Sequence, residues 1–365
     1  MNGKAASLLS VLLLLCSLSV VLGQTPTPRP KARQVPVRKT PKPTPAKTPR
    51  PGQPKVTPTP TPGIPTTGNY TFALQVDELE RRYTVHVPPR YDGKTPVPLV
   101  IVLHGGGTSP RTAMSETGWM TRADLAAFLV VFPEAMTPDP KRPPDFFGNP
   151  AKWNDGSTSL PPALRDVDDV GFISALMDEM IAQYSIDETR VFVSGLSNGG
   201  SMALRLGVEL SDRIAAVAAV AGYLFWPKNP KLEFPVSMIY FVGTDDPLVP
   251  LNGGEVRMPG GRFEKRPPAT EAAEQWANML GCRRQALASQ VKEGVQLLTY
   301  GPGMDGTEVA FYIIEGLGHT WPGGKRFLPE RIVGKTSNRI KATDVIWNFF
   351  RTHAKKRVPA RKASP

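Results

Sequence analysis

The sequence predicts an α/β protein in which a mostly parallel sheet is covered by helices on both faces within a single domain. From Asn69 onward, short apolar runs alternate with helical patterns, and this alternation is typical of parallel sheets with connecting helices. Several runs are apolar at every position, as in strands that are buried on both faces. Because 40% of the 365 residues are hydrophobic, the chain can bury a large core.

The spacing of apolar residues predicts the elements in order. Residues 83–87 alternate apolar and polar side chains, as a strand with one exposed face does. Uniformly apolar runs predict buried strands at 99–103, 128–132, 191–193, 236–242 and 309–314. Helical spacing predicts a helix over 170–184, capped by Asp168 or Asp169, one that begins at Asn198, and a last one over 342–350.

Three segments are expected to lie outside the folded domain, which then spans residues 69–352. Residues 1–23 match an export signal, because Lys4 is followed by a short apolar run and a small-residue cleavage site. Residues 24–68 contain 14 prolines, nine Lys or Arg and no acid. They hold too little apolar surface to offset the entropy of ordering, so we expect a disordered, semi-rigid spacer. Residues 353–365 are expected to form a disordered basic tail.

The net charge of +12 belongs to the ends of the chain. Lys4, the spacer and the tail carry +1, +9 and +5, so residues 69–352 carry −3. A slightly acidic folded part argues against a nucleic-acid-binding domain. The basic segments are either solvated spacers or electrostatic contacts to an anionic cell envelope or acidic polysaccharide. The apolar run of the signal is too short for a membrane span, so the protein is expected to be secreted, extracellular or periplasmic.

The motif Gly195-Leu196-Ser197-Asn198-Gly199 matches the nucleophile-elbow pattern of α/β-hydrolases. Chance also produces this pattern in glycine-rich chains, so its position between a predicted strand and a predicted helix is the informative part. Glycines permit the tight turn that lifts a serine out of the sheet. Ser197 is therefore the predicted nucleophile, and the alternative is a glycine-rich turn.

A serine nucleophile needs a base, and the chain has four histidines. His86 lies within a predicted strand, His104 comes before the serine, and His353 lies in the basic tail. His319 follows the predicted strand 309–314 and comes after the serine, as the order serine, acid, histidine requires. His319 is therefore the predicted base, and the alternative is a loop histidine that only packs.

The acid that orients this base is expected between Ser197 and His319, after a strand. Asp245 and Asp246 directly follow the predicted strand 236–242. We favour Asp246 as the acid. The other aspartate is then a turn residue that hydrogen-bonds its own backbone.

The oxyanion of an acyl-transfer reaction needs backbone donors, which glycines can bring close. His104-Gly105-Gly106-Gly107 follows the predicted strand 99–103. One N–H from this loop, with that of Asn198, would complete an oxyanion hole. Gly106 is the first choice and Gly107 the second, and a plain β-turn is the alternative.

The remaining residues of interest carry weaker signals. Trp153 and Trp321 are loop aromatics that either bind an apolar or sugar-bearing substrate or pack in the ordinary way. Cys282 is the one cysteine left without the signal, and we expect a small apolar filler. No cluster has metal-ligand spacing and no nucleotide-binding fingerprint occurs, so we expect neither a metal nor a cofactor.

These motifs resemble those of the polyhydroxybutyrate depolymerase and feruloyl esterase family of exported α/β-hydrolases. The resemblance covers residues 83–350, and its phrases occur at 103–107, 153–156, 166–170, 195–199, 243–250 and 318–323. It implies hydrolysis of carboxylic esters through an acyl-enzyme, with Ser197 as nucleophile, Asp246 as acid and His319 as base. No added domain for binding solid polyester is visible. The implied substrates are therefore feruloyl or acetyl esters on plant polysaccharide, or hydroxyalkanoate oligomers.

Two other classes stay open at this point. Serine peptidases of the prolyl-oligopeptidase type share the sheet and the triad, although no propeller or other gating domain is visible here. A non-catalytic wall-binding homologue would depend on the proline-rich segment, and the intact set of serine, aspartate and histidine argues against it. Assays with a short-chain p-nitrophenyl ester and a peptide anilide separate these classes.

Overall fold

The computed structural model describes residues 67–76, 78–225, 231–259, 261–283 and 285–356. The predicted export signal, nearly all of the predicted spacer and the end of the predicted tail lie outside the described residues. No helix in the described ranges is long and apolar enough to cross a membrane.

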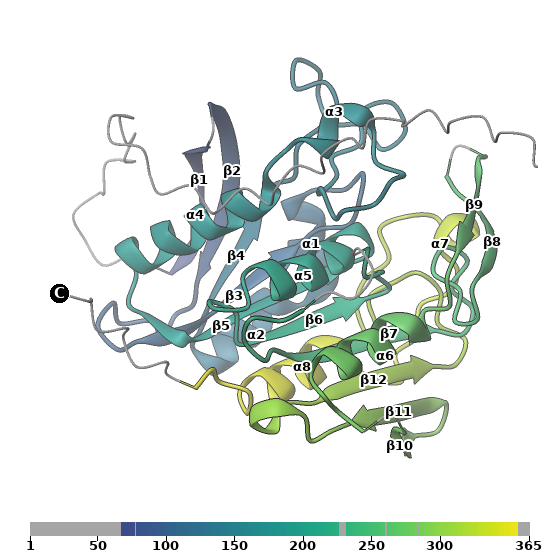
Figure 1. The fold of residues 1–365 in the computed structure, drawn as a ribbon. Helices are drawn as coiled ribbons and strands as arrows, with labels where there is room; N and C mark the ends of the chain where they lie inside the picture. Colours follow the sequence, from purple (N-terminus) through teal and green to yellow (C-terminus); the bar gives the residue numbers. More distant parts are fainter. Residues whose placement is uncertain (1–66, 77, 226–230, 260, 284, 357–365) are drawn as a thin grey trace, which may run out of the picture. The chain divides into compact units, whose positions relative to one another are not determined.

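A ten-stranded sheet forms the centre of the described part (Figure 1). Its strand order is β1-β2-β4-β3-β5-β6-β7-β12-β11-β10. The strands from β4 to β12 in this order are parallel, and antiparallel strands extend both edges. The strands are β1 (Gly68–Val76), β2 (Leu79–Val87), β3 (Val97–Leu103), β4 (Leu129–Pro133), β5 (Ile186–Leu196), β6 (Ala216–Val220), β7 (Ser237–Gly243), β10 (Leu287–Lys292), β11 (Val295–Tyr300) and β12 (Val309–Ile314).

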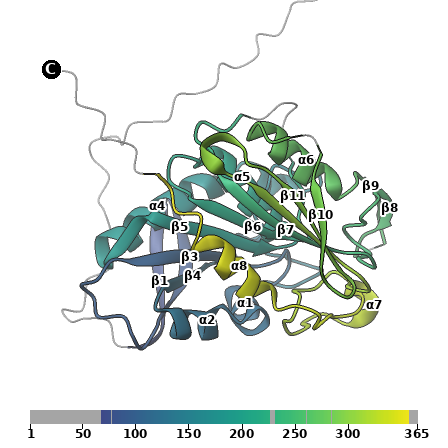
Figure 2. The same cartoon turned by 90° about the horizontal axis from the view of Figure 1, so that it is seen from below.

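Helices cover both faces of this sheet (Figure 2). One face carries α4 (Asp169–Gln183), α5 (Asn198–Glu209) and α6 (Thr270–Met279). The other carries α1 (Pro110–Thr117), α2 (Trp119–Ala126) and α8 (Ala342–Phe350). The shorter elements are α3 (Pro162–Arg165), α7 (Glu330–Val333), the 3₁₀ turn η1 (Met304–Gly306), and a separate hairpin of β8 (Gly254–Arg257) and β9 (Phe263–Arg266). The predicted α/β class with a mostly parallel sheet is confirmed.

The predicted elements are all present, with small differences at their ends. β12 and α8 have the predicted bounds, whereas β5 starts five residues earlier than expected, at Ile186. Asp168 caps α4, because its carboxylate accepts a hydrogen bond from the Gly171 N–H (2.8 Å). Every residue of β3, β4, β6 and β7 is buried, as expected for strands covered on both faces.

Ordered contacts continue past the expected end of the domain at residue 352. The Lys355 N–H donates to the Thr189 carbonyl (2.8 Å), and Lys356 forms an ion pair with Asp305 (3.1 Å). Cys282 is a buried free thiol whose pKa is raised by burial. This environment fits the expected role as an apolar filler.

The sheet positions the predicted site through its parallel strands, whose carboxyl ends share one edge. Loops that leave this edge carry the glycine-rich segment after β3, Ser197 after β5, Asp246 after β7 and His319 after β12. In open α/β sheets ligands bind at this edge. Residues separated by more than 200 positions in the sequence are thereby brought to one place.

Candidate active site

Ser197 forms the sharp turn between β5 and α5. Its backbone angles, φ 57° and ψ −123°, are strained for a residue with a Cβ. A Cβ at Gly195 would overlap the Gly199 carbonyl oxygen, and one at Gly199 would overlap the Leu103 carbonyl oxygen. Only glycine fits at these two positions, so the motif forms the tight turn expected from the sequence.

His319 is held by a buried carboxylate. Its Nδ1 lies 2.9 Å and 3.1 Å from the two carboxylate oxygens of Asp246, whose side chain is fully buried. Asp246 also accepts the backbone N–H groups of Leu248 and Val249, each at 2.8 Å. An ionised carboxylate only accepts hydrogen bonds. Nδ1 therefore carries the proton, and Nε2 is the nitrogen available to act as a base.

The neighbouring aspartate is placed differently. Asp245 is exposed, and its carboxylate accepts the Thr244 hydroxyl at 2.8 Å. No hydrogen bond or ion pair between described residues joins it to His319. The expectation that the second aspartate would hydrogen-bond its own backbone is not met by Asp245, because the backbone N–H groups of the turn bind Asp246 instead.

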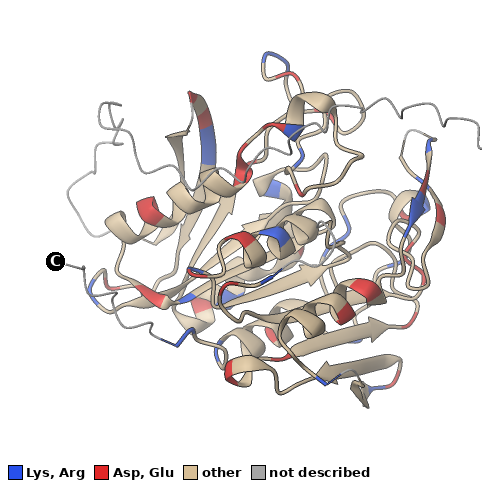
Figure 3. Cartoon of the chain, viewed as in Figure 1, with Lys and Arg blue, Asp and Glu red and all other residues tan. Residues whose placement is uncertain are grey.

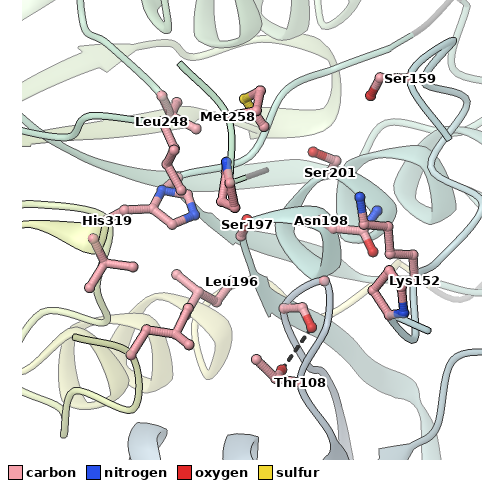
Figure 4. A pocket seen from close by; sticks show the side chains of 18 of the residues that line it. Thr108, Lys152, Ser159, Leu196, Ser197, Asn198, Ser201, Leu248, Met258 and His319 are labelled. Carbon is pink, nitrogen blue, oxygen red and sulfur yellow. Dashed lines mark hydrogen bonds between the residues drawn. The ribbon is translucent and has the colours of Figure 1, made fainter. Parts of the chain in front are cut away.

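Ser197 and His319 line the same pocket, which has a volume of about 380 Å³ (Figure 4). No hydrogen bond between described residues joins the Ser197 Oγ to the imidazole. Contacts of this kind often tighten only when substrate binds. Of the other histidines, His86 binds Asn69 and Asp124 (2.8 Å and 2.9 Å) on β2, far from the sheet edge that carries the pocket.

Two residues that line this pocket have unpaired backbone donors. Within the described residues the N–H groups of Gly106 and Asn198 have no acceptor, and a Cβ built on Gly106 would lie 3.4 Å from the Asn198 Cβ. Asn198 is the first residue of α5, where backbone N–H groups lack helical partners. The Gly107 N–H, in contrast, donates to the Ala151 carbonyl (2.7 Å). Gly107 is thus a weaker choice than Gly106 for an oxyanion donor.

His104 braces the glycine-rich loop from inside. Its Nε2 accepts the Ala135 N–H (3.1 Å), so Nδ1 carries the proton and donates to the Gly105 carbonyl (2.9 Å). Burial lowers the pKa of His104 to about 4, and the ring is neutral at pH 7. Thr108 adds a hydroxyl bond to the same carbonyl (2.7 Å; Figure 4).

Trp153 and Trp321 do not fit the expectation that they contact substrate. Trp153 is 0% exposed and Trp321 1% exposed, and neither lines the pocket. The Trp153 indole donates to the His104 carbonyl (3.0 Å), and the Trp321 indole donates to the Thr343 hydroxyl (3.0 Å). Both bury their rings and satisfy their N–H groups inside the protein, which is ordinary packing.

The side chain of Asn198 holds the loop that contains Trp153 and Asp155 in place. It accepts the Trp153 N–H (2.8 Å) and donates to the carboxylate of Asp155 (2.8 Å). Burial raises the pKa of Asp155 to about 6. A second buried carboxylate, Asp169, accepts the Asn154 N–H (2.6 Å) and pairs with Arg81. The phrases at 153–156 and 166–170 are therefore one interlocked scaffold behind the site.

The pocket also contains charged residues that no motif indicated. Glu116 of α1 and Lys152, in the segment that follows β4, both line it, and burial raises the pKa of Glu116 to about 7. The β8–β9 hairpin adds charges of both signs, visible in Figure 3. Isolated charged residues form no motif, so the sequence does not show that the fold brings them to one pocket. No group of three or more metal-binding side chains occurs in the described ranges.

Similarity to known proteins agrees with this architecture. Residues 91–258 match the phospholipase/carboxylesterase family. The chain is 30% identical over 290 residues to the putative esterase NocK of Nocardia uniformis, covering 74% of this chain and 79% of that protein. It is 28% identical to feruloyl esterase B of Piromyces equi, over 67% of this chain but only 44% of that longer protein. An acetyl xylan esterase structure from Aspergillus awamori superposes with a TM-score of 0.51 at 14% identity, covering 77% and 99% of the two chains.

The fold and these similarities define an α/β-hydrolase. The chain belongs to the phospholipase/carboxylesterase family and is a serine esterase. The resemblance to feruloyl esterases noted from the sequence is confirmed at modest identity.

Proposed function

We propose that this esterase is exported and uses Ser197, His319 and Asp246 as a catalytic triad. The observation that carries the proposal is the meeting of three features in one pocket. These are a strained serine at a strand-to-helix turn, an imidazole whose Nδ1 is bound to a buried carboxylate (2.9 Å), and two backbone N–H groups without acceptors. Each feature has structural explanations, but together they match the requirements of acyl transfer.

The mechanism follows from these positions. The Ser197 Oγ attacks the ester carbonyl carbon while His319 Nε2 takes the hydroxyl proton. Asp246 stabilises the imidazolium and keeps its tautomer. The negative oxygen of the tetrahedral intermediate accepts the N–H groups of Gly106 and Asn198. His319 then protonates the departing alcohol oxygen, an acyl-serine remains, and a water activated by His319 hydrolyses it.

The proposed substrates are feruloyl or acetyl esters on polysaccharide, or soluble hydroxyalkanoate oligomers. The pocket is lined by apolar and aromatic side chains, among them Phe146, Tyr223 and Phe225, together with the charged groups described above. Such a mixed lining suits small acyl groups attached to polar alcohols. We also infer export, because residues 1–23 have the composition of a secretory signal.

The test is hydrolysis of p-nitrophenyl acetate by the full chain, followed by a panel of methyl ferulate, acetylated xylan and hydroxybutyrate oligomers. A phosphonate inhibitor should label Ser197, as located by mass spectrometry. Ser197→Ala should fold normally and lose about 10⁴-fold in turnover. A variant that keeps a tenth of the wild-type turnover contradicts the proposal. Cleavage of a peptide anilide in preference to esters would instead indicate a peptidase.

A further inference from the structure

Lys152 forms part of the pocket wall beside the proposed oxyanion site. Its backbone is fixed, because its N–H donates to the Met136 carbonyl (2.9 Å) and the preceding Ala151 carbonyl accepts the Gly107 N–H (2.7 Å). Its side chain passes along Gly106. A Cβ built on that glycine would lie 3.4 Å from the Lys152 Cγ and 3.5 Å from its Cε. The ammonium is thereby held near the place where an ester would react.

This ammonium has no partner in the part of the chain that the structure describes, since no hydrogen bond or ion pair reaches its Nζ. An ammonium carries three donors and is strongly hydrated, so half-burying it without an acceptor from the protein removes part of its hydration at a cost. Burial lowers the pKa of Lys152, although nearby acids oppose that shift. An ammonium without a hydrogen-bond or ion-pair partner would stabilise an anion that binds beside it.

The nearest acids are already engaged by other groups. Glu264 lies between two arginines of the hairpin, Arg266 (2.6 Å) and Arg262. The two carboxylate oxygens of Asp155 accept the Ser157 N–H (3.0 Å) and the Asn198 amide (2.8 Å). Among these charged groups of the described residues, Lys152 is thus the one that no hydrogen bond or ion pair engages.

The geometry also indicates which half of an ester would meet this lysine. His319 and Lys152 lie on opposite sides of Ser197 (Figure 4). The alcohol must receive its proton from His319, so the alcohol half of the ester lies on the histidine side. The acyl half then extends past Asn198 towards the lysine.

We propose that Lys152 is an anion-binding subsite for the acyl group, so that the enzyme prefers esters whose acyl chain ends in a carboxylate. This inference rests on the proposed function, which identifies the bond that is broken. It adds a preference for a terminal carboxylate, which feruloyl and acetyl groups lack. The carboxylate supplies the acceptor that Lys152 lacks, and a charge-assisted hydrogen bond in an enclosed site is strong.

The test compares kcat/KM for the monomethyl and dimethyl esters of succinic, glutaric, adipic and suberic acids at pH 7. The four lengths allow for the reach of the side chain. Lys152→Met removes the charge and Lys152→Arg keeps it. Lys265→Met is the matched control, because Lys265 is an exposed lysine of β9 that does not line the pocket.

The wild-type preference for the monoester at its best length should fall at least about tenfold in Lys152→Met. It should be partly kept in Lys152→Arg and unchanged in Lys265→Met. The inference is overturned if the monoester-to-diester ratio is the same in wild type and Lys152→Met. It is also overturned if Lys152→Met instead changes the preference for 6-acetoxyhexanoate over its methyl ester, in which the carboxylate lies on the alcohol half.

Binding provides a readout that does not depend on turnover. In the Ser197→Ala background, calorimetry with the four monomethyl esters should show binding at the best length that Lys152→Met weakens at least about tenfold. Equal affinity with and without the lysine contradicts the subsite. A wild-type protein that hydrolyses none of the esters, but binds the monoester through Lys152, contradicts the proposed function and leaves the subsite standing.

Discussion

At the scale of single residues, the sequence identifies some of the candidate site residues, and burial in the structure distinguishes the others. That Ser197 and His319 lie at one pocket could be predicted, because each follows a strand whose carboxyl end is at the same edge of the sheet. The sequence favours Asp246 over the adjacent Asp245, and the family resemblance implies the same residue. Burial distinguishes them, because Asp246 is enclosed and bound to His319 whereas Asp245 is exposed.

We predict that Asp246→Asn lowers turnover by orders of magnitude, whereas Asp245→Asn has a small effect. An amide can donate to Nδ1 and so favour the wrong tautomer of His319, which costs about 10⁴-fold in a comparable triad. The exposed neighbour loses only a local hydrogen bond of roughly 1 kcal/mol. Steady-state kinetics on a soluble ester measures both variants, and equal losses or the reverse order would overturn the choice of acid.

The neutral His104 gives a prediction for stability against pH. Its folded pKa of about 4 lies below its usual value of 6.5, so the unfolded chain takes up a proton first as the pH falls. Stability is therefore lost between about pH 6.5 and pH 4, by roughly 3 kcal/mol in total. His104→Gln, which keeps one donor and one acceptor, should lack this component.

Urea unfolding at several pH values measures the difference between wild type and His104→Gln. Asp155 titrates in the same range, with its pKa raised to about 6 by burial, but it is present in both proteins and cancels in the difference. Parallel stability curves from pH 7.5 to pH 4 would show that His104 is not buried in its neutral form.

At the scale of elements, the sequence predicts strands and helices whose apolar spacing is unambiguous. It misses a strand whose residues favour a helix. β12 and α8 are recognised because their apolar spacing is unambiguous. β6 is the sequence Ala-Val-Ala-Ala-Val, and alanine favours helices. It is a strand because α5 packs closely over it, and a Cβ at Gly207 of that helix would already lie 2.7 Å from Val217. Tertiary packing overrides propensity here.

The last helix, α8, closes one face of the sheet through Phe350. This ring stacks on Phe192 of β5 (4.5 Å between centroids) and on Trp119 of α2 (6.1 Å), and it is fully buried. We predict that Phe350→Ala lowers the free energy of unfolding by about 3–5 kcal/mol, the usual cost of such a cavity. Phe263→Ala is the control, because that ring is 58% exposed. Chemical denaturation measures both, and similar losses would contradict the packing role.

At the scale of the whole molecule, most of the net positive charge lies in the sequence that precedes the described domain. Figure 3 shows acidic and basic residues interspersed over the described domain, whereas residues 24–68 carry nine cations and no acid. A sequence of this kind cannot contribute a periodic apolar face to a core. Composition therefore predicts a catalytic domain preceded by a spacer. It does not predict the charged pocket wall, because enclosure by distant segments creates it.

We predict that a protein starting at Gly68 keeps the melting temperature of the full chain and its turnover on small soluble esters. Attachment of the full chain to anionic polysaccharide should weaken on truncation and fade with added salt, because exposed charges are screened beyond about 10 Å at 0.1 M. A thermal melt, a soluble-ester assay and a pull-down at two salt concentrations compare the two proteins. If the shorter protein melts well below the full chain, the segment packs on the domain and the prediction is wrong.

The β8–β9 hairpin has a consequence for how this enzyme could change over time. Among the residues that the structure describes, its strands pair with each other and with no strand of the ten-stranded sheet, yet Met258, Arg262 and Glu264 from this segment line the pocket. Insertions, deletions or reversals of charge there would alter what the pocket accepts without shifting the register of any core strand. Substrate preference can thus diverge among descendants of this chain while the hydrolytic chemistry is inherited intact.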